Sequence, residues 1–471
     1  MKRFNRIFLG SDDQVLSLNQ RATHTYVIGQ SGTGKSRAIE SWVMQDVIAG
    51  RGVGVIDPHG DLFYNLLLRL AIRPDLWKQI VILNPLDPKW TVGFNPLQDI
   101  GSLPQERLAL YLTDIGIKIW KLSPSDAPRM VWLLTNTFLA LAGLGLTLLD
   151  LPRFLMDTEF RENFLPRLPI EAARNFFLYE FPKSEGAIHQ WVTPVLNKMG
   201  GLIFDPDIRL MFVGDSTVDF RRLIDKKHIL LVNLPKGILG ESPSALLAAF
   251  IVAHLQKAAL SRVDTQKRTP FYLYLDEFQN YTTDNIKDIL SESRKYALSL
   301  TLAHQYLDQL SADLRSAVLN TAGMLVSFRI SYNDAIRLAK EIFPSPDYLS
   351  NLETRIHFNR FGLMPFPTIR SRQDDLGWSS LALLLSKLEH REFWMRRSGP
   401  YLPLKQRTFE MPTRFLNEEM KSRTGELLDF SGNRFGRLKA EARQEYTGRY
   451  VYFQNAQRNH RVGNDGSPWS L

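Results

Sequence analysis

Short runs of hydrophobic residues recur along the chain, and most of them are followed by a stretch with helical spacing. We expect the runs to be strands, since continuous apolar segments of about four to eight residues are typical of parallel sheets buried on both faces. The runs are residues 25–28, 52–56, 79–83, 228–234, 271–275, 298–303 and 324–330. Their alternation with helices predicts a doubly wound α/β fold with a mainly parallel sheet.

The segment 100–215 interrupts this alternation because it has almost no strand pattern. Leu, Ala, Trp and Phe recur there at helical spacing, which predicts an all-helical domain inserted into the α/β domain. Its stretch 131–151 is the best candidate for a transmembrane helix, but polar residues and glycines interrupt it at Asn136, Gly143, Gly145 and Asp150. A bilayer span needs about 20 predominantly apolar residues. We therefore expect a buried helix, a break at the two glycines and a second helix, with no membrane span.

Beyond residue 345 the pattern is weaker. Residues 357–368 predict one or two strands, and residues 379–391 predict a helix. From Ser431 onward the chain is polar, with seven Lys or Arg against three acids, a net charge of +4. This part is interpreted either as a solvated tail or as a contact for nucleic acid or a partner. The predicted domains are 1–99 and 216–400 (two parts of the α/β domain), 100–215 (the helical insertion) and 401–471 (a basic extension).

Composition narrows the classes of function. The chain has 471 residues, of which 44% are hydrophobic and 23% charged, as in folded globular proteins. It has no cysteine, which excludes a disulfide scaffold, a thiolate zinc site and a cysteine nucleophile. A formal net charge of +9 favours a polyanionic partner. The basic residues 1–9 lack a following apolar core, so we predict no signal peptide and a soluble, cytoplasmic protein.

The clearest chemical motif is a phosphate-binding loop of the form G-x-x-x-x-G-K-S between a predicted strand and a predicted helix. It comprises Gly29, Gln30, Ser31, Gly32, Thr33, Gly34, Lys35 and Ser36. Glycines let successive N–H groups point at one anion, at the positive end of the helix dipole. We expect Lys35 to reach the β- and γ-phosphates and the Ser36 hydroxyl to hold Mg²⁺. The motif predicts binding of a nucleoside triphosphate.

A pair of acids completes the predicted hydrolytic site. Asp276 and Glu277 follow the hydrophobic run 271–275, and ligands of parallel sheets bind at the carboxyl ends of strands. We expect Asp276 to bind Mg²⁺, directly or through water, and Glu277 to orient and polarise the attacking water. Gln305 ends another strand and is expected to sense the γ-phosphate or the water. This arrangement predicts a hydrolase.

Other polar residues near these motifs allow more than one interpretation. Arg294 is either an arginine finger that reaches a neighbour's γ-phosphate or a solvated residue at a helix end. His304 is expected to pack rather than to catalyse. Asp57, with His59 and Asp61, is expected to hydrogen-bond the backbone of a turn near the nucleotide rather than to form a separate metal site.

The order of seven segments resembles the FtsK–HerA superfamily of DNA-pumping ATPases. The segments are GQSGTGKS, VGVIDPHGD, FNPL, PVLNKMG, DFRRLIDKKHILLVNLPKGILGE, YLDEFQNY and SRKYALSLTLAHQ. The chain looks most like the conjugative, type IV secretion coupling proteins (the VirD4/TraG/TrwB type) and their soluble relatives, over about residues 20–340. The resemblance implies a RecA-like P-loop core that binds ATP and Mg²⁺, forms hexameric rings with nucleotide between subunits and passes DNA through a central channel.

The family's site residues carry over to matching positions of this sequence. Lys35, Ser36, Asp276, Glu277 and Gln305 match the phosphate, magnesium and water positions. The trans-acting arginine finger matches Arg294, with Arg329 as the second candidate. Coupling proteins in membranes carry transmembrane helices before the phosphate loop, and here the loop begins at residue 29. The resemblance therefore implies either a soluble system or recruitment to the membrane by a partner protein.

Three hypotheses of function follow. The first is an ATP-hydrolysing, ring-forming DNA translocase, with the Lys226–Lys227 pair and the loop 236–240 as candidate DNA contacts. Whether its track is single- or double-stranded DNA stays open. The second is a secretion ATPase that acts on protein cargo, which the basic charge disfavours. The third is a scaffold that uses nucleotide only for assembly, which an intact Glu277 disfavours.

Overall fold

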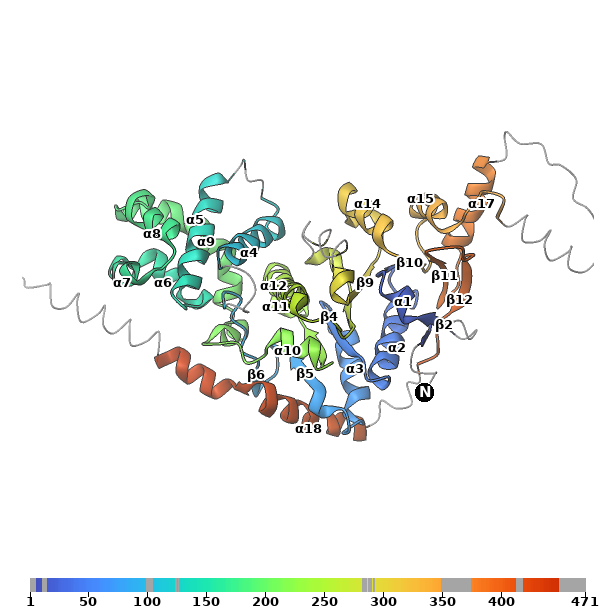
Figure 1. The fold of residues 1–471 in the computed structure, drawn as a ribbon, viewed down its shortest axis with the longest axis horizontal. Helices are drawn as coiled ribbons and strands as arrows, with labels where there is room; N and C mark the ends of the chain where they lie inside the picture. Colours follow the sequence, from blue (N-terminus) through green and yellow to red (C-terminus); the bar gives the residue numbers. More distant parts are fainter. Residues whose placement is uncertain are drawn as a thin grey trace, which may run out of the picture. The chain divides into compact units, whose positions relative to one another are not determined.

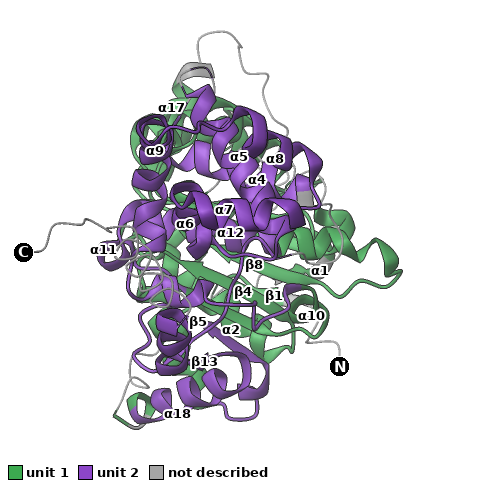
Figure 2. Ribbon diagram, turned by 90° about the vertical axis from the view of Figure 1, so that its left-hand side faces the viewer, with its two compact units in different colours: residues 1–72, 221–232, 255–421 green, residues 73–220, 233–254, 422–471 purple. Residues whose placement is uncertain are grey.

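The computed structural model describes residues 6–10, 15–98, 105–122, 125, 127–281, 286, 290, 293–348, 374–411 and 418–448 (Figure 1). The chain forms two compact units, and each unit is assembled from three separate stretches (Figure 2). Unit 1 comprises residues 1–72, 221–232 and 255–421. Unit 2 comprises residues 73–220, 233–254 and 422–471.

In the part of unit 1 that the structure describes, eight strands belong to the central sheet, in the order β12-β11-β10-β3-β9-β8-β4-β7. Their bounds are β3 Thr25–Ile28, β4 Gly52–Asp57, β7 Ile229–Asn233, β8 Phe271–Leu275, β9 Leu298–His304, β10 Met324–Ser327, β11 Glu392–Arg397 and β12 Leu404–Arg407. Neighbours from β10 through β3, β9 and β8 to β4 are parallel. The residues of β3, β4 and β7 to β10 are all buried, which explains why these strands read as unbroken hydrophobic runs. The predicted α/β class is confirmed.

The helices of unit 1 follow the strands as a doubly wound fold requires. Their bounds are α1 Leu18–Arg21, α2 Lys35–Ile48, α3 Asp61–Ala71, α10 Phe220–Asp225, α14 Ala312–Thr321, α15 Tyr332–Ile342 and α17 Asp374–Ser386. Helices α2 and α3 pack against each other and against β4, and α15 packs on α17. A separate two-stranded ribbon pairs β1 (Arg6–Phe8) with β2 (Val15–Ser17).

Unit 2 is mainly helical. Its helices are α4 Gln105–Ile119, α5 Pro128–Gly143, α6 Leu151–Met156, α7 Thr158–Phe164, α8 Glu171–Asn175, α9 Glu185–Ile203 and α11 Lys236–Leu239, with parts of α12 Glu241–Leu260 and α18 Glu418–Phe435. Its strands are β5 Ile80–Leu83, β6 Trp90–Thr91 and β13 Arg437–Leu438. Helix α5 ends at Gly143 and Gly145 has a φ of 65°, so the predicted break is confirmed.

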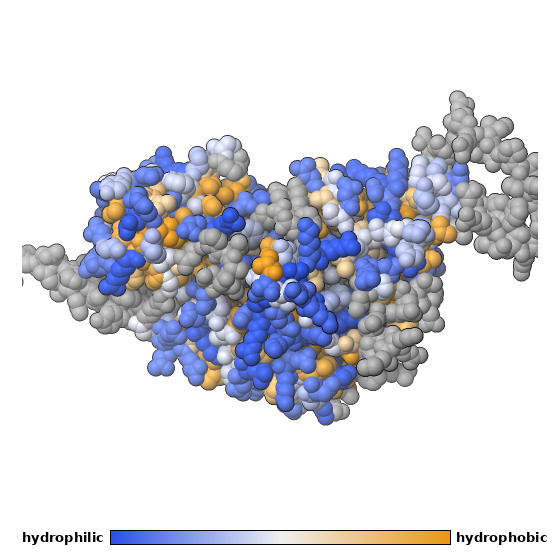
Figure 3. Space-filling model, viewed as in Figure 1, coloured by the Kyte–Doolittle hydropathy of each residue, from blue (hydrophilic) through white to orange (hydrophobic). Residues whose placement is uncertain are grey.

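Many hydrophobic residues on the helices of unit 2 are buried, whereas others, such as Trp132 and Tyr179, are exposed. Over helices α5 to α9, the face drawn in Figure 3 mixes hydrophobic with hydrophilic residues. Among the described residues, one helix, Glu241–Asp264, is long and apolar enough to cross a membrane, and 89% of its most apolar window is buried. Such burial is typical of a helix in a protein core.

Several predictions for the C-terminal third need correction. The predicted helix 379–391 is α17, which already ends at Ser386, and the antiparallel strands β11 and β12 were not predicted. Strand β11 reads Glu-Phe-Trp-Met-Arg-Arg, a short hydrophobic run between charged residues, and only Phe393 and Met395 are fully buried, which weakens the strand pattern. The strands predicted within 357–368 lie outside the described residues.

The interpretation of the chain after Ser431 as a solvated tail is wrong as far as residue 448. Strand β13 pairs with β6, and residues 439–448 are helical. The Ser431 hydroxyl donates to the Ile80 carbonyl, and the Lys439 ammonium donates to Asp207 at 2.6 Å although Lys439 is only 3% exposed. The polar composition concealed this packing because these polar groups are buried in pairs.

Candidate nucleotide-binding site

The phosphate loop connects β3 to α2 and needs glycine at defined places. Gly32 and Gly34 have φ angles of 74° and 108°, a region that other residues rarely adopt. A Cβ on Gly29 would lie 2.6 Å from the Cβ of Phe328. The backbone N–H of Gly29 donates to the His304 carbonyl at 3.3 Å, and that of Gln30 donates to the Arg329 carbonyl at 2.9 Å. The loop is thereby held between the ends of β9 and β10.

Lys35 and Glu277 form a buried ion pair beside this loop. The Lys35 Nζ donates to Glu277 Oε1 at 2.8 Å, and the two side chains are each only 6% exposed. Gln305 Nε2 donates to the same oxygen at 3.2 Å, and Gln279 Nε2 donates to Oε2 at 2.8 Å. Burial alone would raise the pKa of the Glu277 carboxyl, but the Lys35 charge and these three hydrogen bonds outweigh it and lower the pKa. Glu277 is therefore held as a carboxylate.

Asp276, at the end of β8, is the second buried acid. Its Oδ1 accepts the N–H of Glu277 at 3.1 Å. The pKa of Asp276 is raised to about 7, chiefly by burial and also by the nearby Asp57 and Glu277 carboxylates, although the Lys35 charge counteracts them. A cation bound here would relieve this repulsion. Asp276 and the Ser36 hydroxyl line one pocket, and oxygen atoms of this kind are the ligands that Mg²⁺ prefers.

The pocket has a volume of about 380 Å³. Six of the eight predicted loop residues line it; Gly29 and Thr33 do not. Asp276, Glu277 and Gln305 line it as well, so the structure brings the predicted loop, acids and glutamine together. The remaining lining residues are Asp57, His59, Asp61, Leu62, Arg37 and His390. The arrangement can bind a phosphate chain with its cation and present a carboxylate to a water molecule.

Two further predictions concern residues beside the pocket. Asp57 accepts the N–H groups of His59 at 2.8 Å and Phe63 at 2.9 Å, so it hydrogen-bonds the backbone of its turn as predicted. His304 is buried and contacts the Tyr26 hydroxyl and the ring of Phe278. Burial lowers the pKa of His304 to about 3, and the Lys35 charge adds to this effect. A neutral packing residue, as predicted, fits these facts.

Neither arginine candidate is among the residues that line the pocket. Arg294 is exposed in the short 3-10 turn Ser293–Tyr296, and its charge acts on His24, whose pKa falls to about 4 chiefly through burial. His24 precedes β3, so Arg294 lies at the opposite end of that strand from the phosphate loop. Arg329 is exposed, and its backbone carbonyl holds the loop.

One element at the pocket was not predicted. The connection from α17 to β11 places His390 and Arg391 against the phosphate loop: His390 Nδ1 lies 2.9 Å from the Gly32 carbonyl oxygen, and the N–H of Arg391 donates to the Thr33 carbonyl at 2.8 Å. No local sequence signal marks this contact, because it depends on the unpredicted strand β11.

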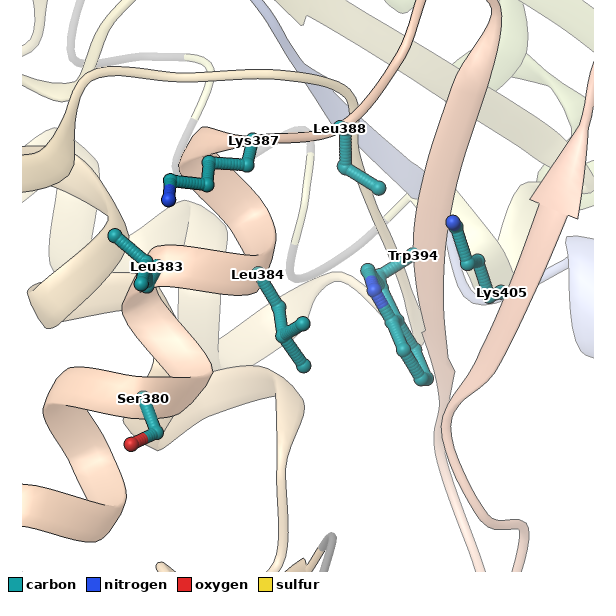
Figure 4. Close-up of a pocket in the computed structure, with 7 residues that line it drawn as sticks. All are labelled: Ser380, Leu383, Leu384, Lys387, Leu388, Trp394 and Lys405. Carbon is teal, nitrogen blue, oxygen red and sulfur yellow. The ribbon is translucent and has the colours of Figure 1, made fainter.

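A second pocket, of about 370 Å³, lies between α17 and the β11–β12 pair (Figure 4). Leu383, Leu384, Leu388 and Trp394 make it apolar, and Lys387 and Lys405 lie at its sides. It contains neither a carboxylate nor a phosphate loop, so it offers no comparable chemistry.

No protein-family model matches the sequence, and no curated protein matches it. Solved structures do match. A structure of the bacterial conjugative coupling protein TrwB, in its form TrwBdeltaN70, has a TM-score of 0.59 and 16% identity, covering 87% of this chain and 91% of the TrwBdeltaN70 chain. A TrwB complex with ADP and Mg²⁺ has a TM-score of 0.59 and 17% identity, covering 87% and 92%. VirB4 of Thermoanaerobacter pseudethanolicus has a TM-score of 0.52 and 13% identity, covering 87% and 98%.

Fold and site together define the class of P-loop NTPases. More narrowly, the fold is that of the solved structures of TrwB and VirB4.

Proposed function

We propose that this protein is an ATP-hydrolysing, ring-forming DNA translocase of the coupling-protein kind. One observation carries the proposal: Glu277 is a buried carboxylate that is joined to Lys35 and Gln305 within a single pocket. A protein that used nucleotide only for assembly would not need a charged base beside the phosphate loop.

In the proposed reaction each group has one task. The loop N–H groups and Lys35 hold the phosphates of ATP and offset the charge that develops during transfer. Ser36 and Asp276 would hold Mg²⁺, which neutralises phosphate charge when bound. Glu277 accepts a proton from the attacking water, and Gln305 positions that water.

Other features support the proposals that the protein forms a ring and that it acts on DNA. Arg294 lies at the opposite end of β3 from its own phosphate loop, and an arginine finger acts in trans from such a position if subunits stack head to tail in a hexamer. TrwB is a conjugative coupling protein, and the net charge of +9 suits a phosphate backbone. Lys226 and Lys227 are exposed and are candidate DNA contacts, as is the segment 236–240. The proposed place of work is the cytoplasm, with a partner protein for any recruitment to a membrane.

The test is ATP turnover by the purified protein without DNA, with single-stranded DNA and with double-stranded DNA, at low and moderate salt. We expect DNA to stimulate turnover, salt to reduce the stimulation and Glu277→Gln to abolish it. The preferred form of DNA would identify the track. Turnover that ignores DNA would instead favour the secretion ATPase with protein cargo.

A further inference from the structure

The turn 389–392 packs against the phosphate loop, although the two are far apart in the sequence. It is closed by a hydrogen bond from the Glu392 N–H to the Glu389 carbonyl at 3.1 Å. It is anchored to the end of β12, where the Thr408 N–H donates to the Arg391 carbonyl at 2.9 Å. The β11–β12 strand pair thus fixes the position of the turn.

Two consecutive carbonyls of the phosphate loop are bound by this turn. The Gly32 carbonyl faces His390 Nδ1 at 2.9 Å, and the Thr33 carbonyl accepts the Arg391 N–H at 2.8 Å. Because a carbonyl oxygen only accepts hydrogen bonds, the imidazole must carry its proton on Nδ1. Gly34 of the loop also lies close to the turn, since a Cβ on Gly34 would lie 3.0 Å from the Arg391 Cα.

These bonds set the direction of the loop's N–H groups. In a trans peptide the C=O and the N–H point in opposite directions. With the Thr33 carbonyl held toward the turn, the N–H of Gly34 points away from it. With the Gly32 carbonyl held by His390, the N–H of Thr33 faces the interior of the loop, where it donates to the Gln30 carbonyl at 3.4 Å. A phosphate loop needs its N–H groups preset toward one anion.

We propose that His390 is a positioning residue of the nucleotide site, which holds the phosphate loop in its binding conformation through the Gly32 carbonyl. The inference rests on the proposed function, because it presumes that the loop binds ATP. His390 lines the pocket and is exposed, and the hydrogen bonds of Glu277 go to Lys35, Gln279 and Gln305 rather than to His390. Loss of the His390 N–H therefore weakens nucleotide binding and leaves the chemical step intact.

The test compares three variants with the wild type by titration of a fluorescent ATP analogue and by steady-state kinetics. His390→Ala removes the donor, His390→Phe keeps a ring without a donor, and His390→Asn keeps an N–H near the place of Nδ1. We expect Kd and KM to rise about three- to tenfold in the first two, the range of one hydrogen bond, with kcat at saturation unchanged. His390→Asn should restore most of the affinity.

The matched control is Lys387→Ala. Lys387 lies on the same connection from α17 to β11, but it lines the apolar pocket rather than the nucleotide pocket. It should leave Kd and KM unchanged. Wild-type affinity in both His390→Ala and His390→Phe would overturn the inference, and so would an unchanged Kd with a reduced kcat. Lys35→Ala distinguishes a failure of the proposed nucleotide site from a failure of the proposed role of His390. If the wild type binds no analogue, or if Lys35→Ala binds it as tightly as the wild type does, the nucleotide site itself is refuted.

Discussion

Two glycines of the phosphate loop make a matched pair for one experiment. Gly32 and Gly34 both have positive φ angles, 74° and 108°, so an alanine at either place is strained. Such strain costs about 1–2 kcal/mol. They differ in surroundings: a Cβ on Gly32 meets nothing within 4 Å, while a Cβ on Gly34 lies 3.0 Å from the Cα and 3.3 Å from the N of Arg391.

The neighbour at Gly34 cannot easily move away. Arg391 is held by its own N–H bond to Thr33, and its φ of 69° is itself in the left-handed region. A steric shift of this kind in a packed place costs about 1–3 kcal/mol beyond the strain. We therefore expect Gly34→Ala to destabilise unit 1 by about 2–5 kcal/mol and Gly32→Ala by about 1–2 kcal/mol.

The assay is thermal unfolding of the full chain, together with the affinity for an ATP analogue. For a unit of this size, each kcal/mol lowers the unfolding midpoint by about 2–4 °C, which predicts roughly 4–20 °C for Gly34→Ala and about 2–8 °C for Gly32→Ala. Equal shifts in the two variants, or a larger one for Gly32→Ala, would refute the contact between the loop and the turn.

Three other variants test the remaining roles. Glu277→Gln should keep ATP-analogue binding but lower turnover by about 10²–10⁴-fold, measured as phosphate release, because it lacks the base; turnover within threefold of the wild type would contradict that role. By itself, Arg294→Ala should have no turnover. Mixed with the Lys35→Ala variant it should regain part of it, because an arginine finger of one subunit acts on the phosphate loop of its neighbour. No recovery in mixed rings would contradict a role in trans. Gly432→Ala should lower the melting temperature of unit 2 while ATP-analogue affinity stays unchanged, because its Cβ would lie 2.2 Å from a ring atom of Trp90; an unshifted melting curve would show that α18 does not pack there.

The predicted part of the fold is the part in which local pattern and tertiary environment agree. Strands β3, β4, β8 and β9 are buried on both faces, so their hydrophobic runs mark them directly. The loop and the acids could be predicted for a similar reason. A phosphate loop needs glycines and Lys35 next to one another in the chain, and Asp276 and Glu277 follow a buried strand.

The remaining part depends on contacts that no local pattern encodes. Strand β11 is half buried and antiparallel, and its residues are charged at several positions. The contact of His390 with the phosphate loop joins residues 358 positions apart in the chain. Ser431 and Lys439 are polar in sequence but buried in the fold, where their partners come from residues near 80 and 207.

The position of β3 in the sheet has a consequence for synthesis of the protein. Its two neighbours are β9 and β10, which are translated about 300 residues later, so β3 stays without either partner while the ribosome adds them. At about 5–20 residues per second this interval lasts roughly 15–60 s. During that time the nascent chain carries an unpaired hydrophobic strand and a phosphate loop that lacks its acids. Early folding thus yields no complete nucleotide site, but it exposes a segment that needs protection from aggregation until the sheet closes.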